Sequence, residues 1–169
     1  MPSSPSLRTY EATQIEVTLD ISHADFTRTF EGLLGRVNLE ALSTLPTLSA
    51  EAARTKLASF VGPLDFTLFQ KIDHGAVLTV LTGRQARAVT YVFGNALIAV
   101  EMTRHDPRAG LYVPLRLFVQ EIAEGRVLVT YDRPSSLLAP FGSPEIDTVA
   151  RGLDAKVERL LREAAANAR

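Results

Sequence analysis

Three short polar clusters hold the side chains of this sequence that are best suited to chemistry. The first is Asp73-His74-Gly75. An imidazole that titrates near neutrality stands there beside a carboxylate, and could act as an acid, a base or a ligand. The same residues suit a hairpin turn in which Asp73 accepts from backbone amides and Gly75 takes a positive φ. Because purely structural networks also gather such groups, we favour the turn and keep His74 as a candidate.

The second cluster is Arg104-His105-Asp106, which follows a short apolar stretch. In a structural interpretation, the cations compensate the negative end of a short helix, and Asp106 begins a turn before Pro107. In a functional interpretation, Arg104 binds an anionic ligand and His105 transfers a proton, with Glu101 one helical turn earlier. We favour the structural interpretation and keep the functional one open.

The third cluster, Tyr131-Asp132-Arg133-Pro134-Ser135-Ser136, leaves the last predicted strand and enters a loop. Loops on a rigid scaffold are the usual place for a binding site. Asp132 and Arg133 could therefore hold a polar ligand. They could equally tie the loop down, with Asp132 accepting from the amides of Ser135 and Ser136.

Other signals narrow the chemistry further. Asn95 is predicted to cap a short helix whose free amides could bind an anion. The sequence has no Cys, which excludes disulfides, thiolate metal sites and Cys nucleophiles. It also has no Gly-rich phosphate loop and no dinucleotide fingerprint. Its three histidines, His23, His74 and His105, are scattered, so we predict no metal and no cofactor.

The composition is that of a globular protein of ordinary make-up. The 169 residues include 18 basic and 19 acidic side chains, for a formal net charge of -1, and 46% are hydrophobic. Such a length fits one domain with its own core. The basic excess of a binder of nucleic acid or anionic membranes is missing. No apolar stretch approaches the ~20 residues that span a bilayer, and the first residues lack the apolar core of a signal peptide.

These observations predict a cytoplasmic protein with no nucleic-acid and no membrane partner. Residues 1–8 are predicted to form a disordered tail, because they are small, polar and rich in Pro. Residues 9–166 are predicted to form a single domain.

Hydrophobic periodicity predicts the elements that position the three clusters. Alternation over 15–21 predicts a strand, and Ser22 with Asp25 predicts the start of a helix. Ser49 is predicted to cap an inserted helix. Further strands are predicted over 65–72, 76–82, 86–93, 111–121 and 126–132, with a short helix from Asn95 to Arg104 and a long one from Ser143. The order β-α-(inserted helix)-β-β-β-short α-β-β-α predicts an α+β fold, with an antiparallel sheet and helices on one face.

The same strands are predicted to be apolar on both faces. Tyr112 and Phe118 alternate with the core side of their strand, and Tyr91 adds a third aromatic side chain. A sheet that is apolar on both faces needs two covers. The second cover could be the inserted helices, a second subunit or a ligand.

Several separate motifs resemble domain-of-unknown-function family 302. They are Phe93-Gly94-Asn95, Met102-Thr103-Arg104-His105-Asp106-Pro107, Gly110-Leu111-Tyr112-Val113-Pro114-Leu115 and Tyr131-Asp132-Arg133-Pro134-Ser135-Ser136. Asp73-His74-Gly75 stands where that family usually has an Asp-His turn. The resemblance is strongest over 72–161, and Ala96 replaces the family's usual Pro after Gly-Asn. It implies an α+β architecture akin to the TATA-binding-protein-like group, implies dimers, and implies no established reaction.

Two functions are compatible with these patterns. The first is a non-catalytic small-molecule-binding or interaction module that acts as a homodimer. Its candidate ligand-binding residues are Asp73, His74, Asn95, Arg104, His105, Asp132 and Arg133, and its second-face residues are Tyr112, Phe118 and Tyr91. The alternative is a small acid–base enzyme with His74, His105 and Asp132 as catalytic candidates. It requires a His and an Asp (Asp73, Asp106 or Asp132) to converge within hydrogen-bond reach, directly or through one water.

Overall fold

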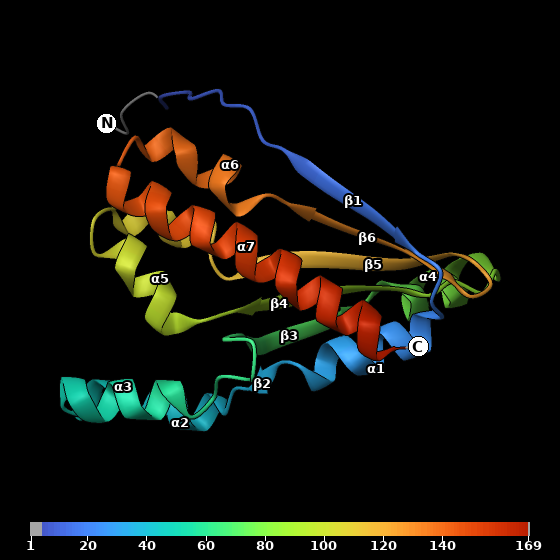
Figure 1. The fold of residues 1–169 in the computed structure, drawn as a ribbon, viewed down its shortest axis with the longest axis horizontal. Coiled ribbons are helices and arrows are strands. Elements are labelled where there is room, and N and C mark those ends of the chain that lie inside the picture. Colours follow the sequence, from blue (N-terminus) through green and yellow to red (C-terminus); the bar gives the residue numbers. More distant parts are fainter. Residues whose placement is uncertain (1–4, 169) are drawn as a thin grey trace.

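A computed structural model describes residues 5–168, with the side chain of Leu39 left out. Six strands form one sheet: β1 (Gln14–Leu19), β2 (Gly35–Arg36), β3 (Thr67–Asp73), β4 (Ala88–Gly94), β5 (Leu115–Ala123) and β6 (Arg126–Asp132). Their order in the sheet is β1-β6-β5-β4-β3-β2 (Figure 1). β2 and β3 run parallel, and all other neighbours are antiparallel.

Helices cover one face of this sheet. α1 (His23–Gly32), α5 (Ala96–Thr103) and α7 (Pro144–Asn167) pack there, with α7 crossing the strands diagonally (Figure 1). α6 (Pro134–Leu138) and the 3-10 turn η3 (Ala139–Phe141) lead from β6 into α7. Phe26, Phe30 and Leu160 are fully buried between the helices and the strands. The predicted α+β class, with helices on one face of an antiparallel sheet, is confirmed.

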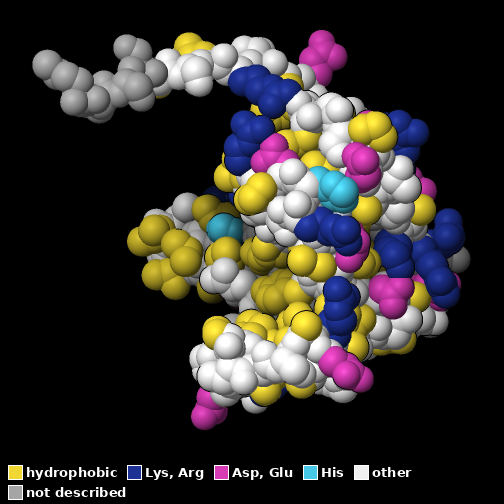
Figure 2. Space-filling model, turned by 90° about the vertical axis from the view of Figure 1, so that its left-hand side faces the viewer, with side chains coloured by type: hydrophobic (Ala, Val, Ile, Leu, Met, Phe, Trp, Pro, Cys, Tyr) yellow, Lys and Arg dark blue, Asp and Glu magenta, His cyan; other side chains and the backbone are white. Residues whose placement is uncertain are grey.

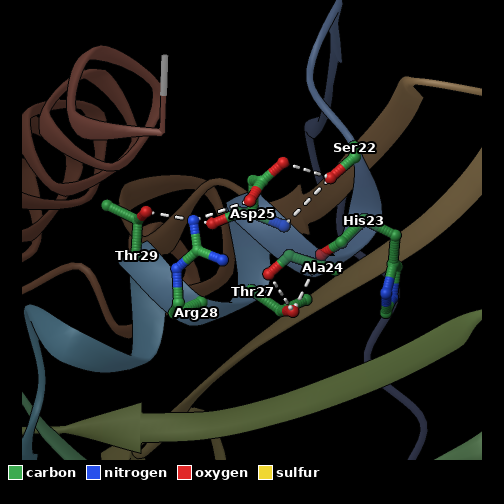
Figure 3. Close-up of polar contacts among 7 residues, drawn as sticks. All are labelled: Ser22, His23, Ala24, Asp25, Thr27, Arg28 and Thr29. Atoms are coloured by element: carbon green, nitrogen blue, oxygen red, sulfur yellow. Dashed lines mark hydrogen bonds and ion pairs between the residues drawn. The ribbon is translucent and has the colours of Figure 1, made fainter.

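The start of α1 shows how local sequence fixes this packing. The Ser22 hydroxyl accepts from the Asp25 amide at 3.1 Å and donates to the Asp25 carboxylate at 2.6 Å (Figure 3). This is the predicted cap, and it satisfies an amide that the first helical turn leaves unpaired. Because the cap fixes the first residue of α1, Phe26 and Phe30 fall on the buried side of the helix.

The inserted segment is an excursion from the β2 edge of the sheet. It contains α2 (Leu39–Ser43), the 3-10 turn η1 (Leu45–Thr47) and α3 (Ala50–Ala58), which buries no side chain (Figure 1). Its two ends cross at glycines. The amides of Gly35 and Gly62 both donate to the Phe66 carbonyl at 2.9 Å. A Cβ on Gly35 would lie 1.9 Å from the Phe60 carbonyl oxygen, so no side chain fits at the crossing.

Residues 74–82 form a helix, α4 (His74–Thr82), and the predicted strand over 76–82 is wrong. The predicted turn at Asp73 is wrong in form as well. The Asp73 side chain caps α4 by accepting from the Ala76 amide at 2.9 Å. The helix ends at Gly83, which has a φ of 69°, whereas Gly75 lies inside α4. Capping and a glycine stop therefore outweigh the β-rich composition of this run.

The face opposite the helices, here called the open face, mixes polar and apolar side chains. One row of paired residues crosses it as Ile72, Thr90, Phe118, Thr130 and Glu16. The predicted apolar character of the second face is therefore only partly right. Because Thr90, Thr130 and Glu16 are polar, this face can remain partly exposed to solvent without a second layer of structure over it.

Only one of the three aromatic residues assigned to that face lies on it. Phe118 does, whereas Tyr91 points to the helix side, fully buried, and donates to the Glu31 carboxylate of α1 at 2.7 Å. Tyr112 lies between η2 (Pro107–Leu111) and β5, not within a strand. Its ring packs edge-on against Phe141 and Tyr10, with centroids 6.0 and 6.2 Å away. The strand predicted over 111–121 begins instead at Leu115, after this turn.

Candidate functional site

A shallow hollow of about 220 Å³ lies on the open face. It spans four strands, because alternation in each strand turns every second side chain to this side. Its lining includes Gln14, Thr90, Arg116, Phe118, Thr130 and Asp132. The hollow thus offers one cation, one anion, two hydroxyl groups and an aromatic ring.

His74 stands at the edge of this hollow. It is the first residue of α4, and its Nε2 lies 3.0 Å from the Thr90 hydroxyl. Its ring meets Phe118 edge-on, with centroids 6.0 Å apart. The structure therefore places two sequence candidates, His74 and Asp132, around the same open-face surface, connected by Thr90 and Phe118.

Arg104, His105 and Asp106 do not join this surface. They follow α5, which begins where β4 ends, whereas Asp73 pairs with Val89 near the start of β4. Arg104 is exposed and pairs with Glu101 at 3.2 Å. Asp106 caps η2, and hydrogen bonds from the Arg108 side chain and backbone lower the pKa of its carboxyl. The structural interpretation of this cluster accounts for both charged side chains.

The acid–base alternative needs a histidine beside a carboxylate. Within residues 5–168, no histidine forms an ion pair with an acidic side chain. His74 and His105 are both exposed and flank opposite ends of β4. No direct pair of a histidine and a carboxylate is therefore present in the part of the chain that the structure describes.

Asn95 acts as the predicted cap. Its Oδ1 accepts from the amides of Leu97 at 2.9 Å and Ile98 at 3.4 Å, and its Nδ2 donates to the Asp65 carbonyl at 3.0 Å. The side chain is thus occupied by its own helix and by the loop before β3. The small cavity beside it, about 180 Å³, is lined mainly by apolar side chains such as Ile98 and Met102. This surrounding does not favour an anion.

The loop after β6 is held differently from the prediction. The Ser135 amide donates to the Asp154 carboxylate at 2.9 Å, and the Ser136 amide donates to the Arg133 carbonyl at 3.0 Å. The expectation that Asp132 accepts from both amides is therefore wrong. Asp154 of α7 takes part of that role, which leaves the Asp132 side chain in the open-face hollow. Arg133 is exposed at the start of α6.

A surface that the sequence analysis missed lies on α4. Val77, Leu78, Val80 and Leu81, here called the α4 patch, are 58, 46, 81 and 79% exposed. Figure 2 shows hydrophobic side chains gathered on a part of the molecule that projects at its left edge. As a strand, this run would have buried every second residue. The signal available in the sequence was an Asp cap followed by apolar residues at the helical spacing of Val77, Val80 and Leu81.

Few contacts hold α4 to the sheet. Gly75 packs against the chain entering β4, where a Cβ would lie 2.6 Å from the Ala86 carbonyl oxygen. The Thr79 hydroxyl accepts from the Ala86 amide at 3.0 Å. Only this narrow side of the helix is covered, so its large apolar side chains remain in water.

The third histidine, His23, lies at the start of α1, and Figure 3 shows its ring turned away from the Ser22 cap. Its Nε2 is buried and has no hydrogen-bond partner among the residues that the structure describes. Burial is the largest effect on this ring and lowers its pKa below 6.5, so the neutral form is favoured. Across residues 5–168, no three His, Asp or Glu side chains come together as a metal would require.

Fold and surface together define a class: an α+β protein with one helix-covered sheet face, one open face and an exposed apolar helix beside it. The family described as "Domain of unknown function DUF302" matches residues 43–164. This chain therefore belongs to the DUF302 family, as the motifs predicted.

A solved structure supports the fold. The crystal structure of the uncharacterized conserved protein DUF302 from Bacillus stearothermophilus is similar to this chain with a TM-score of 0.61 and 14% sequence identity. The match covers 89% of this chain and 97% of the other. At this identity the likeness shows the fold alone. The comparison with curated proteins finds no match. In the described part of the chain, no helix combines the length and apolar character needed to cross a bilayer.

Proposed function

We propose that this protein is an interaction module that forms a homodimer through the α4 patch and holds a small polar molecule in the open-face hollow beside it. The α4 patch carries this proposal. A helix with apolar side chains on most of its surface is normally buried. Four large apolar side chains on one short helix expose a few hundred Å², which on a soluble protein marks an interaction site.

A second copy of the chain is the partner that best fits this patch. Between His74 and Thr82, α4 has no charged residue, whereas helices that lie on anionic membranes carry Lys or Arg. The patch lies beside the open face, because His74 at the start of α4 contacts Thr90 and Phe118 there. A twofold axis would therefore seat each α4 against the open face of the other copy. In this interface the patch would form the apolar core and the open face the polar rim. A standard interface of this kind buries roughly 800 Å² per partner.

The hollow suggests the chemistry of the bound molecule. Arg116 and Asp132 offer opposite charges, and Thr90 and Thr130 offer hydroxyl groups in the neighbouring row of the sheet, on either side of Phe118. This set suits a small zwitterion that carries both a carboxylate and an amine. In the dimer, the partner's helix would exclude water from the rim, which strengthens each polar contact. We favour binding without turnover over acid–base catalysis, because no histidine forms an ion pair with a carboxylate among the described residues.

The first test changes the α4 patch. The double variant Val80→Glu/Leu81→Glu places two charges at the most exposed positions of the helix. We expect the wild-type protein to sediment as a dimer at micromolar concentration and the variant to sediment as a monomer with an unchanged circular dichroism spectrum. Leu111→Glu, at an 81% exposed leucine on η2, is the matched control and should stay dimeric. A wild-type monomer, or a dimer that survives the double change, would refute the dimer.

The second test concerns the bound molecule. Native mass spectrometry of freshly purified protein should show extra mass that disappears in a denatured run. Arg116→Gln and Asp132→Asn should each lose that mass, because each removes one charge of the hollow. Arg133→Gln, an exposed arginine next to Asp132, should retain it. Wild-type protein without any passenger mass would count against the small-molecule part and leave the dimer to the first test.

A further inference from the structure

A small apolar cavity lies where β4 ends and α5 begins. We call it the α5 cavity, and its volume is about 180 Å³. Its lining comes from β3, β4, α5, α7 and the start of β5. The cavity is on the helix-covered side of the sheet, because Leu115 lines it whereas the next residue, Arg116, lines the open-face hollow. The function proposed above uses none of the residues that line it.

Two local features of the strands make room for this cavity. Phe69 is the extra residue of a bulge in β3, since Leu68 and Gln70 on either side of it pair with consecutive residues of β4. Gly94, the last residue of β4, lies beside it. A Cβ on Gly94 would lie 3.3 Å from the Pro114 Cβ and 3.6 Å from the Phe69 ring. A side chain at this position would therefore narrow the cavity.

The cavity has a buried floor and an accessible mouth. Met102, Leu115 and Leu153 form the floor and are 0, 7 and 3% exposed. Pro114 is exposed and Phe69 is half-buried, so solvent reaches the other end of the cavity. A molecule of the right size can therefore reach the floor without the core opening.

The lining offers no free polar side chain to an occupant. Among the residues that the structure describes, Asn95 supplies the single polar side chain of the lining. Its Oδ1 accepts from two amides of α5, and its Nδ2 donates to the Asp65 carbonyl. A buried water needs roughly two to four polar partners, so water is a poor occupant of this space. An apolar molecule would replace it with little loss of hydrogen bonding.

We propose that the α5 cavity binds a small uncharged aromatic molecule, about the size of one benzene ring. The size follows from the volume, since an apolar cavity of about 150 Å³ is large enough to bind benzene. The aromatic character follows from Phe69 and Met102, because a phenyl ring and a thioether both make favourable contacts with an aromatic ring. A charged molecule is disfavoured, because no side chain of the lining would pair with its charge.

Methyl NMR spectroscopy with toluene tests this site. Met102 is one of two methionines in the chain, so labelling the methionine methyl groups gives a simple spectrum, and Met102→Leu assigns the signal. Toluene should move the Met102 signal saturably, because the ring current of a bound aromatic molecule acts on a methyl group beside it. A Met102 signal that does not move up to the solubility limit of toluene would overturn the proposal.

Filling the cavity should abolish this response. Ala99→Leu places a larger side chain in the lining and should weaken toluene binding at least about tenfold. Ala155→Leu, at an exposed position of α7 outside the cavity, is the matched control and should bind toluene like the wild type. Should Ala99→Leu lose its circular dichroism spectrum, Ala96→Leu at the half-buried rim replaces it with the same expectation. Unchanged toluene affinity in the folded variant would rule the site out.

Three further probes test the chemistry of the occupant. Benzoate and benzylamine carry the same ring with a charge of either sign, and neither should move the Met102 signal where toluene saturates it. Cyclohexane has a similar size without an aromatic face, so it should displace toluene only at higher concentration. Binding of benzoate or benzylamine as tight as that of toluene, or displacement of toluene by cyclohexane at equal concentration, would contradict the assignment.

Discussion

α4 and α5 are two short helices of similar composition that differ in how far the rest of the chain buries them. Each begins with an Asx cap, Asp73 or Asn95, and each consists mainly of Ala, Val, Leu and similar residues. α5 packs against α7 and α3 and buries Met102 completely, whereas α4 buries only Gly75. The apolar content of a short helix therefore does not say whether its own chain will cover it. What decides is whether another element of the fold lies over it.

The comparison gives α4 a meaning that composition alone does not. The apolar side chains of α5 contribute to the stability of the folded chain, because burial removes them from water. Those of α4, which are 46 to 81% exposed, contribute much less until something covers them. A helix of this kind is expected to gain its stabilisation from association, and substitutions in the two helices should therefore be measured by different experiments.

The largest contrast is expected for truncations to alanine. Met102→Ala removes a fully buried side chain and should lower the free energy of unfolding by about 3 kcal/mol. Leu81→Ala, at a 79% exposed position, should change it by less than about 0.5 kcal/mol when measured in dilute monomer. Urea unfolding of both variants checks this. Equal losses would mean that α4 packs on its own chain after all.

A smaller effect is expected at Gly75, the contact that holds α4. Gly75→Ala brings a Cβ within 2.6 Å of the Ala86 carbonyl oxygen, and should cost roughly 1–3 kcal/mol and loosen the helix. Hydrogen exchange of the α4 amides would show the loosening. Gly152→Ala in α7, where nothing lies within 4 Å of the new Cβ, should instead stabilise by roughly 0.5–1 kcal/mol. Unchanged exchange in α4 would show that Gly75 does not anchor it.

The two caps should differ in the same direction. Asn95→Ala loses two accepted amides and the bond donated to Asp65, so we expect a cost of about 1–2 kcal/mol by thermal unfolding. Asp73→Ala loses the bond from Ala76 and should cost about 0.5–1 kcal/mol. A larger cost for Asp73→Ala would imply that α4 contributes more to stability than its exposure indicates.

The smallest expected effect depends on pH. Burial lowers the pKa of His23 below the 6.5 of an unfolded chain, so the unfolded state binds a proton more readily. The contribution of His23 to stability is therefore fully present above pH 6.5 and is lost as the pH falls below 6.5 through the lowered pKa of the folded state. His23→Gln should flatten that slope in urea unfolding, whereas His105→Gln, at an exposed position, controls for loss of a histidine. An unchanged slope in His23→Gln would show that this ring is not responsible.

Most of the fold could be predicted because its signals are local. Ser22, Asn95 and Ser143 each cap a helix where the sequence placed one, and the strands from β4 onward follow the alternation of apolar residues. Residues 76–82 could not be assigned in this way. A short run such as Val77 to Thr82 is apolar at most positions, so periodicity alone does not separate strand from helix, and the choice depends on whether a neighbouring strand offers an unpaired edge. β3 and β4 pair with each other, which leaves α4 outside the sheet.

The site was harder to predict than the fold. Because they are neighbours in the sequence, His74 was predicted to act with Asp73, and His105 with Asp106. In the structure, each of the two acids caps a helix instead. The groups that actually surround His74, Thr90 and Phe118, come from other strands. Strand register set this arrangement, and register depends on pairing across the whole sheet. The prediction that Tyr91 lies on the second face was wrong for the same reason, because its register turns the side chain to the helix-covered face.

The crossing of Gly35 and Gly62 has a consequence for how this chain can change. The excursion between them starts and returns at one point, so its ends stay together whatever lies between them. The entropy of closing such a loop grows only with the logarithm of its length, about 0.6 kcal/mol for each doubling. The crossing is therefore a splice point, at which α2 and α3 could be exchanged for a longer segment or for another folded domain with the strands kept in place and only the contact between α3 and α5 lost.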